Sequence, residues 1–274
     1  MIREILCMEC EVLSVAIYRT RDLARMAKVH PNTVRLYEKY GLLSPVPRDT
    51  NGYRRYDQRH IVQIRVCRAV YSHPWVGTAF RHAFLAIIRS LIEWDLTTAT
   101  QNAESYLRLL EKEYQQAERT AQILQRWTQS KGCEVEAPGT YSRKQAAEII
   151  GSTPEALRNW ERNGLITVPR VDANGSRRYG RREMERLRII YMLRQSQYSM
   201  SAIARSLAQY DKGYTAGVLD ALHNPVAQDE VSWVLAGDRW LDALAENIFG
   251  AKQVIELLNE ASSCSLQHGA DMLK

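Results

Sequence analysis

The 274-residue sequence has few cysteines, only three phenylalanines and no long apolar run. Its five cysteines are scattered without the dense spacing of a disulfide scaffold, which favours a reducing compartment. No segment approaches the roughly 18 consecutive apolar residues of a membrane span. Residues 1–18 also lack the small-residue cleavage site of a signal peptide. We therefore expect a cytoplasmic protein that does not enter the membrane.

Motifs of metal sites and enzymes are also missing. Cys7-x-x-Cys10 has the spacing of half a zinc site, but no second Cys pair or Cys/His pair follows it. Cys133 follows a long predicted helix and is the best placed cysteine for sensing, so a metal or redox response at these three cysteines stays open. The sequence contains no glycine-rich phosphate loop, Gly-x-Ser-x-Gly or His-Glu-x-x-His motif, and its six histidines form no cluster. We expect neither catalysis nor a bound cofactor or metal.

The positive charge is concentrated in two segments. Residues 18–60 contain 10 Lys/Arg and 4 Asp/Glu, and residues 140–194 contain 12 and 6, so each segment carries +6. The rest of the chain contains 15 basic and 21 acidic residues and carries −6. Two basic segments on an acidic body favour two separate contacts with a polyanion, although an unevenly charged solvated surface would have the same composition.

The two basic segments are copies of one module. A shift of 123 positions aligns YRTRDLARMAKVHPNTVRLYEKYGLL with YSRKQAAEIIGSTPEALRNWERNGLI, and then NGYRRY with NGSRRY. Identical pairs include Pro31/Pro154, Arg35/Arg158, Glu38/Glu161, Gly41/Gly164, Asn51/Asn174 and Tyr56/Tyr179. Average composition would give roughly two or three matches over this length, so the similarity indicates a duplication.

Each copy shows the pattern of two short helices joined by a tight turn. In the first copy Leu23, Ala24 and Ala27 space one helix, and a second helix begins at Pro31 and stops at Gly41. The second helix of such a helix-turn-helix can lie in the DNA major groove. Polar residues expected on its outer face are Asn32, Thr33, Arg35 and Lys39 in the first copy, and Glu155, Arg158, Asn159 and Arg162 in the second.

A small β-hairpin, or wing, is predicted after each second helix. Asn51-Gly52 and Asn174-Gly175 are strong signals for its turn. Arginines beside a tight turn can reach the phosphates that flank the groove. The sequences that follow the two turns are Arg54-Arg55-Tyr56 and Arg177-Arg178-Tyr179.

The pattern Thr-Val-Arg-x-Tyr-Glu-x-x-Gly-Leu-Leu at residues 33–43, followed by Gly-Tyr-Arg-x-Tyr at 52–56, resembles the MerR family of bacterial transcription regulators. The second copy matches through Leu-Arg-x-Trp-Glu at 157–161 and Gly-Leu-Ile at 164–166. Residues 193–207 resemble the family's further helix pair. Motif, order and spacing recur twice, which makes the resemblance specific.

The resemblance implies two tandem winged helix-turn-helix domains that bind double-stranded DNA. It implies that Arg35 and Arg158 face the DNA and that Tyr37, Trp160 and the wing arginines lie near phosphates. Tyr37 and Trp160 are alternatively part of the core. The chain departs from the family at Leu36 and Asn159, where an aromatic residue is usual, and at Trp160, where a tyrosine is usual. The residues expected to contact DNA are Arg21, Asn32, Thr33, Arg35, Tyr37, Lys39, Arg54, Arg55 and Tyr56 in the first copy, and Lys144, Glu155, Arg158, Asn159, Trp160, Arg162, Arg177, Arg178 and Tyr179 in the second.

Heptad patterns of apolar or small residues mark two segments outside the modules. They comprise Ala103, Leu107, Leu110, Tyr114, Ala117, Ala121 and Leu124, and then Leu241, Leu244, Ile248, Ala251, Ile255 and Leu258. The family resemblance implies a dimer helix after the DNA-binding domain, so we expect the two segments to pair as an antiparallel coiled coil within one chain, which makes a pseudo-dimer. A homodimer with four modules, or separate packing of each segment on its own neighbours, are the alternatives.

The predicted fold is therefore mainly α with two small β-wings. It comprises an N-terminal segment (1–17), a first winged helix-turn-helix (18–72), a helical linker with a long helix (73–131), a second winged helix-turn-helix (140–210) and a C-terminal helical region (211–274). The stripe predicted to be core consists of Trp75, Phe80, Phe84, Leu85, Ile88, Leu91 and Trp94. An apolar effector pocket is the alternative, near Trp75, Trp94, Trp233 and Trp240.

Together these features predict a sequence-specific transcription regulator whose two unlike modules bind an imperfect palindrome. By resemblance to the family, the protein distorts the DNA and has RNA polymerase as a partner at the promoter. A small-molecule effector is compatible with this role, and the sign of regulation stays open. An architectural DNA-bending factor of the excisionase type is the alternative, although such proteins are usually short.

Overall fold

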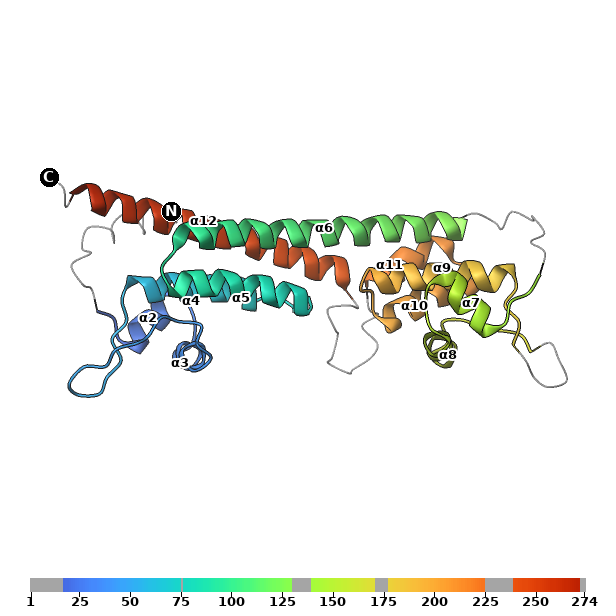
Figure 1. Ribbon diagram of the computed structural model, residues 1–274, viewed down its shortest axis with the longest axis horizontal. Coiled ribbons are helices and arrows are strands. Elements are labelled where there is room, and N and C mark those ends of the chain that lie inside the picture. The colour runs from blue at the N-terminus through green and yellow to red at the C-terminus, as the bar shows by residue number, and fades with distance from the viewer. Residues whose placement is uncertain (1–16, 75, 130–138, 171–176, 225–238, 272–274) are drawn as a thin grey trace. The chain divides into compact units, whose positions relative to one another are not determined.

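The computed structural model describes residues 17–74, 76–129, 139–170, 177–224 and 239–271 (Figure 1). Within these ranges the protein is helical, and β-structure is confined to isolated bridges. The predicted mainly α fold is therefore confirmed. The chain forms two compact units, residues 1–111 with 246–274, and residues 112–245. In the described residues, no helix is long and apolar enough to cross a membrane.

Each unit contains one copy of the module, followed by further helices. The first unit is made of α2 (Thr20–Met26), α3 (Pro31–Lys39), α4 (Gln58–Tyr71), α5 (Thr78–Ile92), the first part of α6 (Leu96–Gln129) and most of α12 (Trp240–Asp271). The second contains the rest of α6, α7 (Arg143–Ile150), α8 (Pro154–Arg162), α9 (Arg181–Gln195), α10 (Met200–Asp211), the 3₁₀ turn η1 (Thr215–Gly217), α11 (Val218–His223) and the start of α12.

The duplication is visible in the helix boundaries. The helices α2, α3 and α4 begin at positions that lie 123 residues before the starts of α7, α8 and α9. A proline occupies the first turn of both α3 and α8, where its missing N–H costs no hydrogen bond. Gly41 and Gly164 follow these helices at φ +67° and +73°, a left-handed conformation that favours glycine. The same local signals therefore start and stop the second helix of both copies.

Most of the apolar stripe predicted between the modules is core of the first unit, although Leu85 is only half-buried. Phe80, Phe84 and Leu91 of α5 are buried, and the Phe84 ring contacts Tyr71 edge-on at 5.3 Å between centroids. Phe84 also lies 6.4 Å from the ring of Tyr106 on α6. These contacts fix α5 between α4 and α6. The predicted pocket residues Trp75 and Trp233 lie outside the described residues, Trp240 is buried, and Trp94 is half-buried.

The buried stripe of α6 follows a heptad pattern, but its register differs from the prediction in one of two rows. Ala103, Leu110, Ala117 and Leu124 are fully buried as expected. The other row is made of Tyr106 and Thr120, with Glu113 between them. Of the row predicted there, Ala121 is buried as expected, whereas Leu107 and Tyr114 are only half-buried. Burial raises the pKa of the Glu113 carboxyl, and its Oε1 atom accepts no hydrogen bond from the described residues. The sequence pattern missed this row because it contains the polar residues Glu113 and Thr120.

The same shift of one residue occurs in α12. Leu244, Ala251 and Leu258 are fully buried as predicted, but the second row consists of Trp240, Asn247 and Val254 instead of Leu241, Ile248 and Ile255. The Asn247 side chain donates a hydrogen bond of 2.8 Å to the carbonyl oxygen of Pro74. A Cβ atom on Gly250 would lie 2.3 Å from the carbonyl oxygen of Ala69, so glycine permits close packing of α12 on α4.

Candidate nucleic-acid interface

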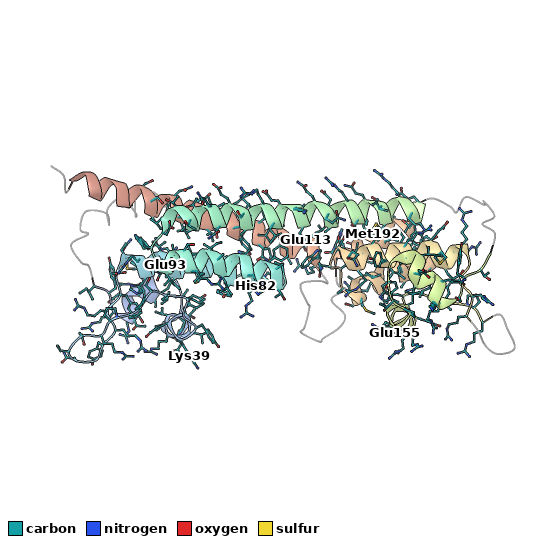
Figure 2. All side chains as sticks on the ribbon, in the orientation of Figure 1. Lys39, His82, Glu93, Glu113, Glu155 and Met192 are labelled. Carbon is teal, nitrogen blue, oxygen red and sulfur yellow. The ribbon has the colours of Figure 1, made fainter. Side chains whose placement is uncertain are left out.

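The outward faces of α3 and α8 carry the residues that the sequence predicted. Asn32, Arg35 and Lys39 are exposed on α3, and Thr33 is half-buried. Figure 2 shows Lys39 on the side of α3 that faces away from α4 and α5. The exposed residues of α8 are Glu155, Arg158, Asn159 and Arg162, and Arg21 and Lys144 are exposed on the preceding helices α2 and α7. Each module therefore presents one polar helix face to solvent.

The two arginines at the centre of these faces differ in their local contacts. The Arg35 guanidinium donates a hydrogen bond of 2.9 Å to Asn32 Oδ1, one turn earlier on α3. Asn32 itself lies in the first turn of α3, where its backbone N–H donates to His30 Nδ1 over 3.1 Å. For Arg158, the described residues include no hydrogen-bond or ion-pair partner. Both side chains are exposed, and both guanidinium groups keep unused donors.

Four aromatic residues predicted to contact DNA are buried. Tyr56 and Tyr179 are 1% and 0% exposed, and Tyr37 and Trp160 are 8% and 6% exposed. The backbone of Tyr56 forms a β-bridge with Tyr18, and that of Tyr179 forms one with Tyr141. Both rings lie in the core of their modules. Burial raises the pKa of Tyr37 to about 12. Rings this buried offer almost no surface to a phosphate, so direct contact by Tyr56 and Tyr179 stays a prediction.

The wing of the first copy is held by Asp49. Its carboxylate accepts hydrogen bonds from the backbone N–H groups of Asn51 (3.0 Å) and Tyr53 (2.8 Å), which shapes the turn, and Gly52 adopts φ +77°. Arg19 donates to Asp49 over 2.6 Å and lies 5.0 Å from the centre of the Tyr53 ring. The hydrogen bond from Arg19 holds the pKa of Asp49 below its ordinary value. Arg48 and Arg54 form the bridge that closes this wing.

The wing of the second copy is described only at its base. Residues 171–176, which include the predicted turn Asn174-Gly175, lie outside the described residues. The bridge at its base joins Arg170 and Arg177, whereas the repeat offset would place the partner of Arg177 at Val171. The two wings therefore differ by one residue in pairing register, although the sequences align without a gap.

A glutamate on each second helix binds an arginine of the wing, and sequence reasoning missed this contact. Glu38 Oε2 accepts from Arg54 Nε over 2.6 Å and lies 3.4 Å from the Tyr56 hydroxyl. The charge of Arg54 is thus paired within the protein. Arg55 has no side-chain ion pair in the described part of the wing and is half-buried.

The equivalent pair in the second copy is part of a larger cluster. Glu161 binds Arg177 through Oε1 and Arg143 through Oε2, the latter over 3.0 Å. Arg143 Nε also donates to the Tyr179 hydroxyl over 3.2 Å. Position 143 corresponds to Thr20 in the first copy, so the second copy has one more charge in this cluster. The identity Glu38/Glu161 was the available signal, but the sequence did not show its partners.

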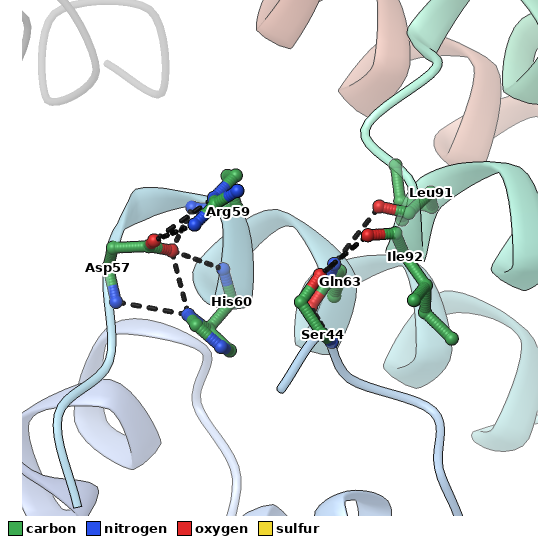
Figure 3. Close-up of polar contacts among 7 residues, drawn as sticks. All are labelled: Ser44, Asp57, Arg59, His60, Gln63, Leu91 and Ile92. Atoms are coloured by element: carbon green, nitrogen blue, oxygen red, sulfur yellow. Dashed lines mark hydrogen bonds and ion pairs between the residues drawn. The ribbon is translucent and has the colours of Figure 1, made fainter. Parts of the chain in front are cut away.

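A buried glutamine fastens the loop after α3 to the end of α5 (Figure 3). Gln63 Oε1 accepts from Ser44 N over 2.9 Å, and Gln63 Nε2 donates to Ser44 Oγ (2.6 Å) and to the Leu91 carbonyl (3.0 Å). Ser44 Oγ donates in turn to the Ile92 carbonyl over 2.9 Å. The position of α3 is therefore coupled to α5 by a fully buried polar network.

Arg186 occupies the equivalent position in the second copy and makes charged contacts in place of those of Gln63. We call the contacts of Gln63 and of Arg186 braces. Its Nε donates to the Leu165 carbonyl in the loop after α8 over 2.6 Å. Its two terminal nitrogens bind both carboxylate oxygens of Asp211, at the end of α10, over 2.6 and 2.9 Å. The carboxylate is half exposed, so salt and solvent weaken this pair.

These braces predict unequal responses to substitution. Gln63→Leu leaves the Ser44 N–H and the Leu91 carbonyl without partners, and we expect a loss of about 2–4 kcal/mol in unfolding free energy. Arg186→Met removes a partly exposed pair and one hydrogen bond, for which we expect about 1 kcal/mol. Urea unfolding measures both losses in free energy, at low salt and at about 0.5 M salt, where surface ion pairs are screened. Equal losses, or a salt effect on Gln63→Leu alone, would contradict this assignment.

The cysteines of the described residues form no metal site. Cys67 is fully buried in α4, and burial raises the pKa of its thiol well above the ordinary value. Cys264 lies near the end of α12. Cys7, Cys10 and Cys133 lie outside the described residues. In the described part of the chain, no three His, Cys, Asp or Glu side chains are grouped so that they could hold a metal ion.

Comparison with known proteins finds a family match for each of the two modules. Residues 19–56 match the family model described as MerR family regulatory protein, and residues 141–210 match that described as MerR HTH family regulatory protein. Both modules belong to the MerR family. The predicted tandem of MerR-type domains is confirmed by these two matches, which fall on the two copies of the repeat.

A curated protein that is similar to part of the chain comes from Haemophilus influenzae and is described as "Probable heavy metal-dependent transcriptional regulator". It is 34% identical over 67 residues, which make up 24% of the chain and 52% of the relative. The match thus spans about half the length of that relative. No solved structure matches the chain.

Proposed function

We propose that the protein is a transcription regulator that binds double-stranded DNA sequence-specifically through two unlike MerR-type modules. The observation that carries this proposal is the pair of exposed polar faces on α3 and α8, which stand at equivalent positions of two basic modules. Arg35 and Arg158 lie at the centre of these faces and can donate two hydrogen bonds to a guanine edge.

The remaining contacts are assigned by position on these helix faces, on the preceding helices and on the wings. Asn32, Thr33 and Lys39 accompany Arg35 toward the groove, and Glu155, Asn159 and Arg162 accompany Arg158. We assign the exposed Arg21 and Lys144 and the half-buried Arg55 and Arg178 to phosphate contacts. Arg54 and Arg177 are paired with glutamates, so they position the wings. The buried aromatic residues support the helices from within the module cores. They are Tyr37, Tyr56, Trp160 and Tyr179.

We further propose that one chain supplies both halves of the DNA contact. The long helices α6 and α12 each carry a buried heptad row, and both have residues in each compact unit. Antiparallel pairing of these helices would join the two modules without a second subunit, because a tether keeps the local concentration of the partner helix in the millimolar range. A homodimer that contains four modules is the competing assembly.

A regulator of this kind is expected to act at a promoter that RNA polymerase also binds, and to distort the DNA between its two contacts. Distortion of 20–30 base pairs costs on the order of 1–6 kcal/mol, which both modules must offset together. An architectural factor of the excisionase type would also bend DNA. Footprinting on the promoter of the protein's own gene, with transcription measured in parallel, distinguishes the two roles because an architectural factor leaves transcription unchanged.

Selection from a random duplex library, followed by native mass spectrometry on the selected DNA, tests the proposal. We expect an operator with two related but unequal half-sites and one chain bound to each operator. The asymmetry follows from the unlike exposed residues of α3 and α8. A strictly symmetric operator with two chains would support the homodimer, and absence of any enriched sequence would refute specific binding.

A further inference from the structure

The outward face of α3 carries one large apolar side chain that remains exposed. Leu36 is 45% exposed, and it lies between Asn32 and Lys39 on the outward side of the helix. The buried side of the same helix is formed by Val34 and Tyr37. A large apolar group in the middle of a polar recognition face is available to an apolar partner on DNA, and thymine offers one in its 5-methyl group.

The equivalent position of α8 holds an exposed amide. Asn159 is 123 positions from Leu36 and is also exposed. Its Oδ1 atom accepts from Asn163 Nδ2 over 2.9 Å, and its Nδ2 lies 3.9 Å from the sulfur of Met200. An amide oxygen accepts two hydrogen bonds and an amide nitrogen donates two.

These contacts orient the Asn159 amide and leave one acceptor and one donor unused. Adenine presents the complementary pair in the major groove, because its N6 donates and its N7 accepts. Thymine presents a methyl group at the corresponding place, which matches Leu36. The two modules thus differ at one equivalent position in a way that distinguishes two bases.

We propose that residues 36 and 159 are the specificity-determining pair that makes the half-sites unlike, with Leu36 contacting a thymine methyl group and Asn159 binding an adenine. This inference rests on the proposed function, since it requires that α3 and α8 enter the major groove. It predicts that the palindrome loses its symmetry at the base pair read by these two residues.

Exchange of the two residues tests the inference. In selections with the full chain, Leu36→Asn should change the preferred base in the first half-site from thymine to adenine, and Asn159→Leu should make the opposite change in the second. Ile123→Asn is the matched control, because it also replaces an apolar residue with an amide, at a 44% exposed position of α6. It should leave the selected operator unchanged.

Modified DNA provides a second test that needs no variant. Replacing the contacted thymine with uracil removes one methyl group and should weaken binding of the unmodified chain about three- to fivefold. Replacing the contacted adenine with 7-deazaadenine removes the N7 acceptor and should weaken it about tenfold or more. Both effects should disappear in Leu36→Ala and Asn159→Ala, respectively.

The outcomes separate this inference from the proposed function. If the chain selects an operator but the exchanged variants select the same bases and the modified bases bind equally well, the inference is overturned while specific binding stands. If the unmodified chain enriches no sequence, both are overturned.

Discussion

Replacing both Arg35 and Arg158 with alanine is expected to abolish specific binding while leaving both modules folded. Each arginine contributes about 1–3 kcal/mol if it binds a base in bidentate fashion, so affinity for the operator should fall about 100-fold or more. Their exposure means that neither side chain supports the core. Titration of the operator, followed by fluorescence anisotropy, measures the loss.

The single variants and a surface control refine this expectation. Arg35→Ala and Arg158→Ala should each weaken binding to one half-site and relax the preference for the base they contact. Arg108→Ala removes an exposed arginine of α6, paired at 3.7 Å with Glu104, and should leave the titration curve unchanged. An unchanged curve for the double variant would mean that α3 and α8 do not read the operator.

Much of this molecule could be predicted from its sequence because the decisive signals are local. Pro31 and Gly41 define one recognition helix, Pro154 and Gly164 define the other, and the structure starts and stops both helices there. The repeat adds a second, independent observation of each signal. Charge segregation and helical spacing then place the exposed face without any knowledge of the tertiary structure.

The parts that were missed depend on contacts between distant residues. The heptad rows were assigned to Leu107 and Ile248 because these are apolar, whereas the buried rows contain Tyr106 and Asn247. Asn247 is tolerated there because the Pro74 carbonyl accepts its hydrogen bond. Periodicity alone cannot reveal such a partner, which lies 173 positions away.

The wing arginines show the same limitation in the binding surface. Arg54 and Arg55 are adjacent and chemically identical, so the sequence assigned both to phosphates. The structure distinguishes them, because strand alternation directs only Arg54 toward Glu38. Burial of Tyr56 follows from its bridge to Tyr18, a pairing that the sequence did not predict.

Glutamate-to-glutamine substitution on the recognition helices is expected to destabilise the second module more than the first. Glu161 is 17% exposed and neutralises two arginines, whereas Glu38 is 24% exposed and pairs with one. Glu161→Gln therefore leaves two partly buried guanidinium groups without a counter-charge. We expect it to cost about 2–3 kcal/mol of unfolding free energy, against about 1 kcal/mol for Glu38→Gln.

The internal repeat supplies a control for this comparison. Arg143→Thr gives the second module the residue that the first has at Thr20, and so removes the extra charge. In that background Glu161→Gln should cost only about as much as Glu38→Gln, since a single arginine then loses its partner. Urea unfolding gives the free energies, and hydrogen–deuterium exchange assigns the loss to residues 141–210 or 19–56. If Glu161→Gln costs the same with and without Arg143, the ion pair between Glu161 and Arg143 does not stabilise the second module.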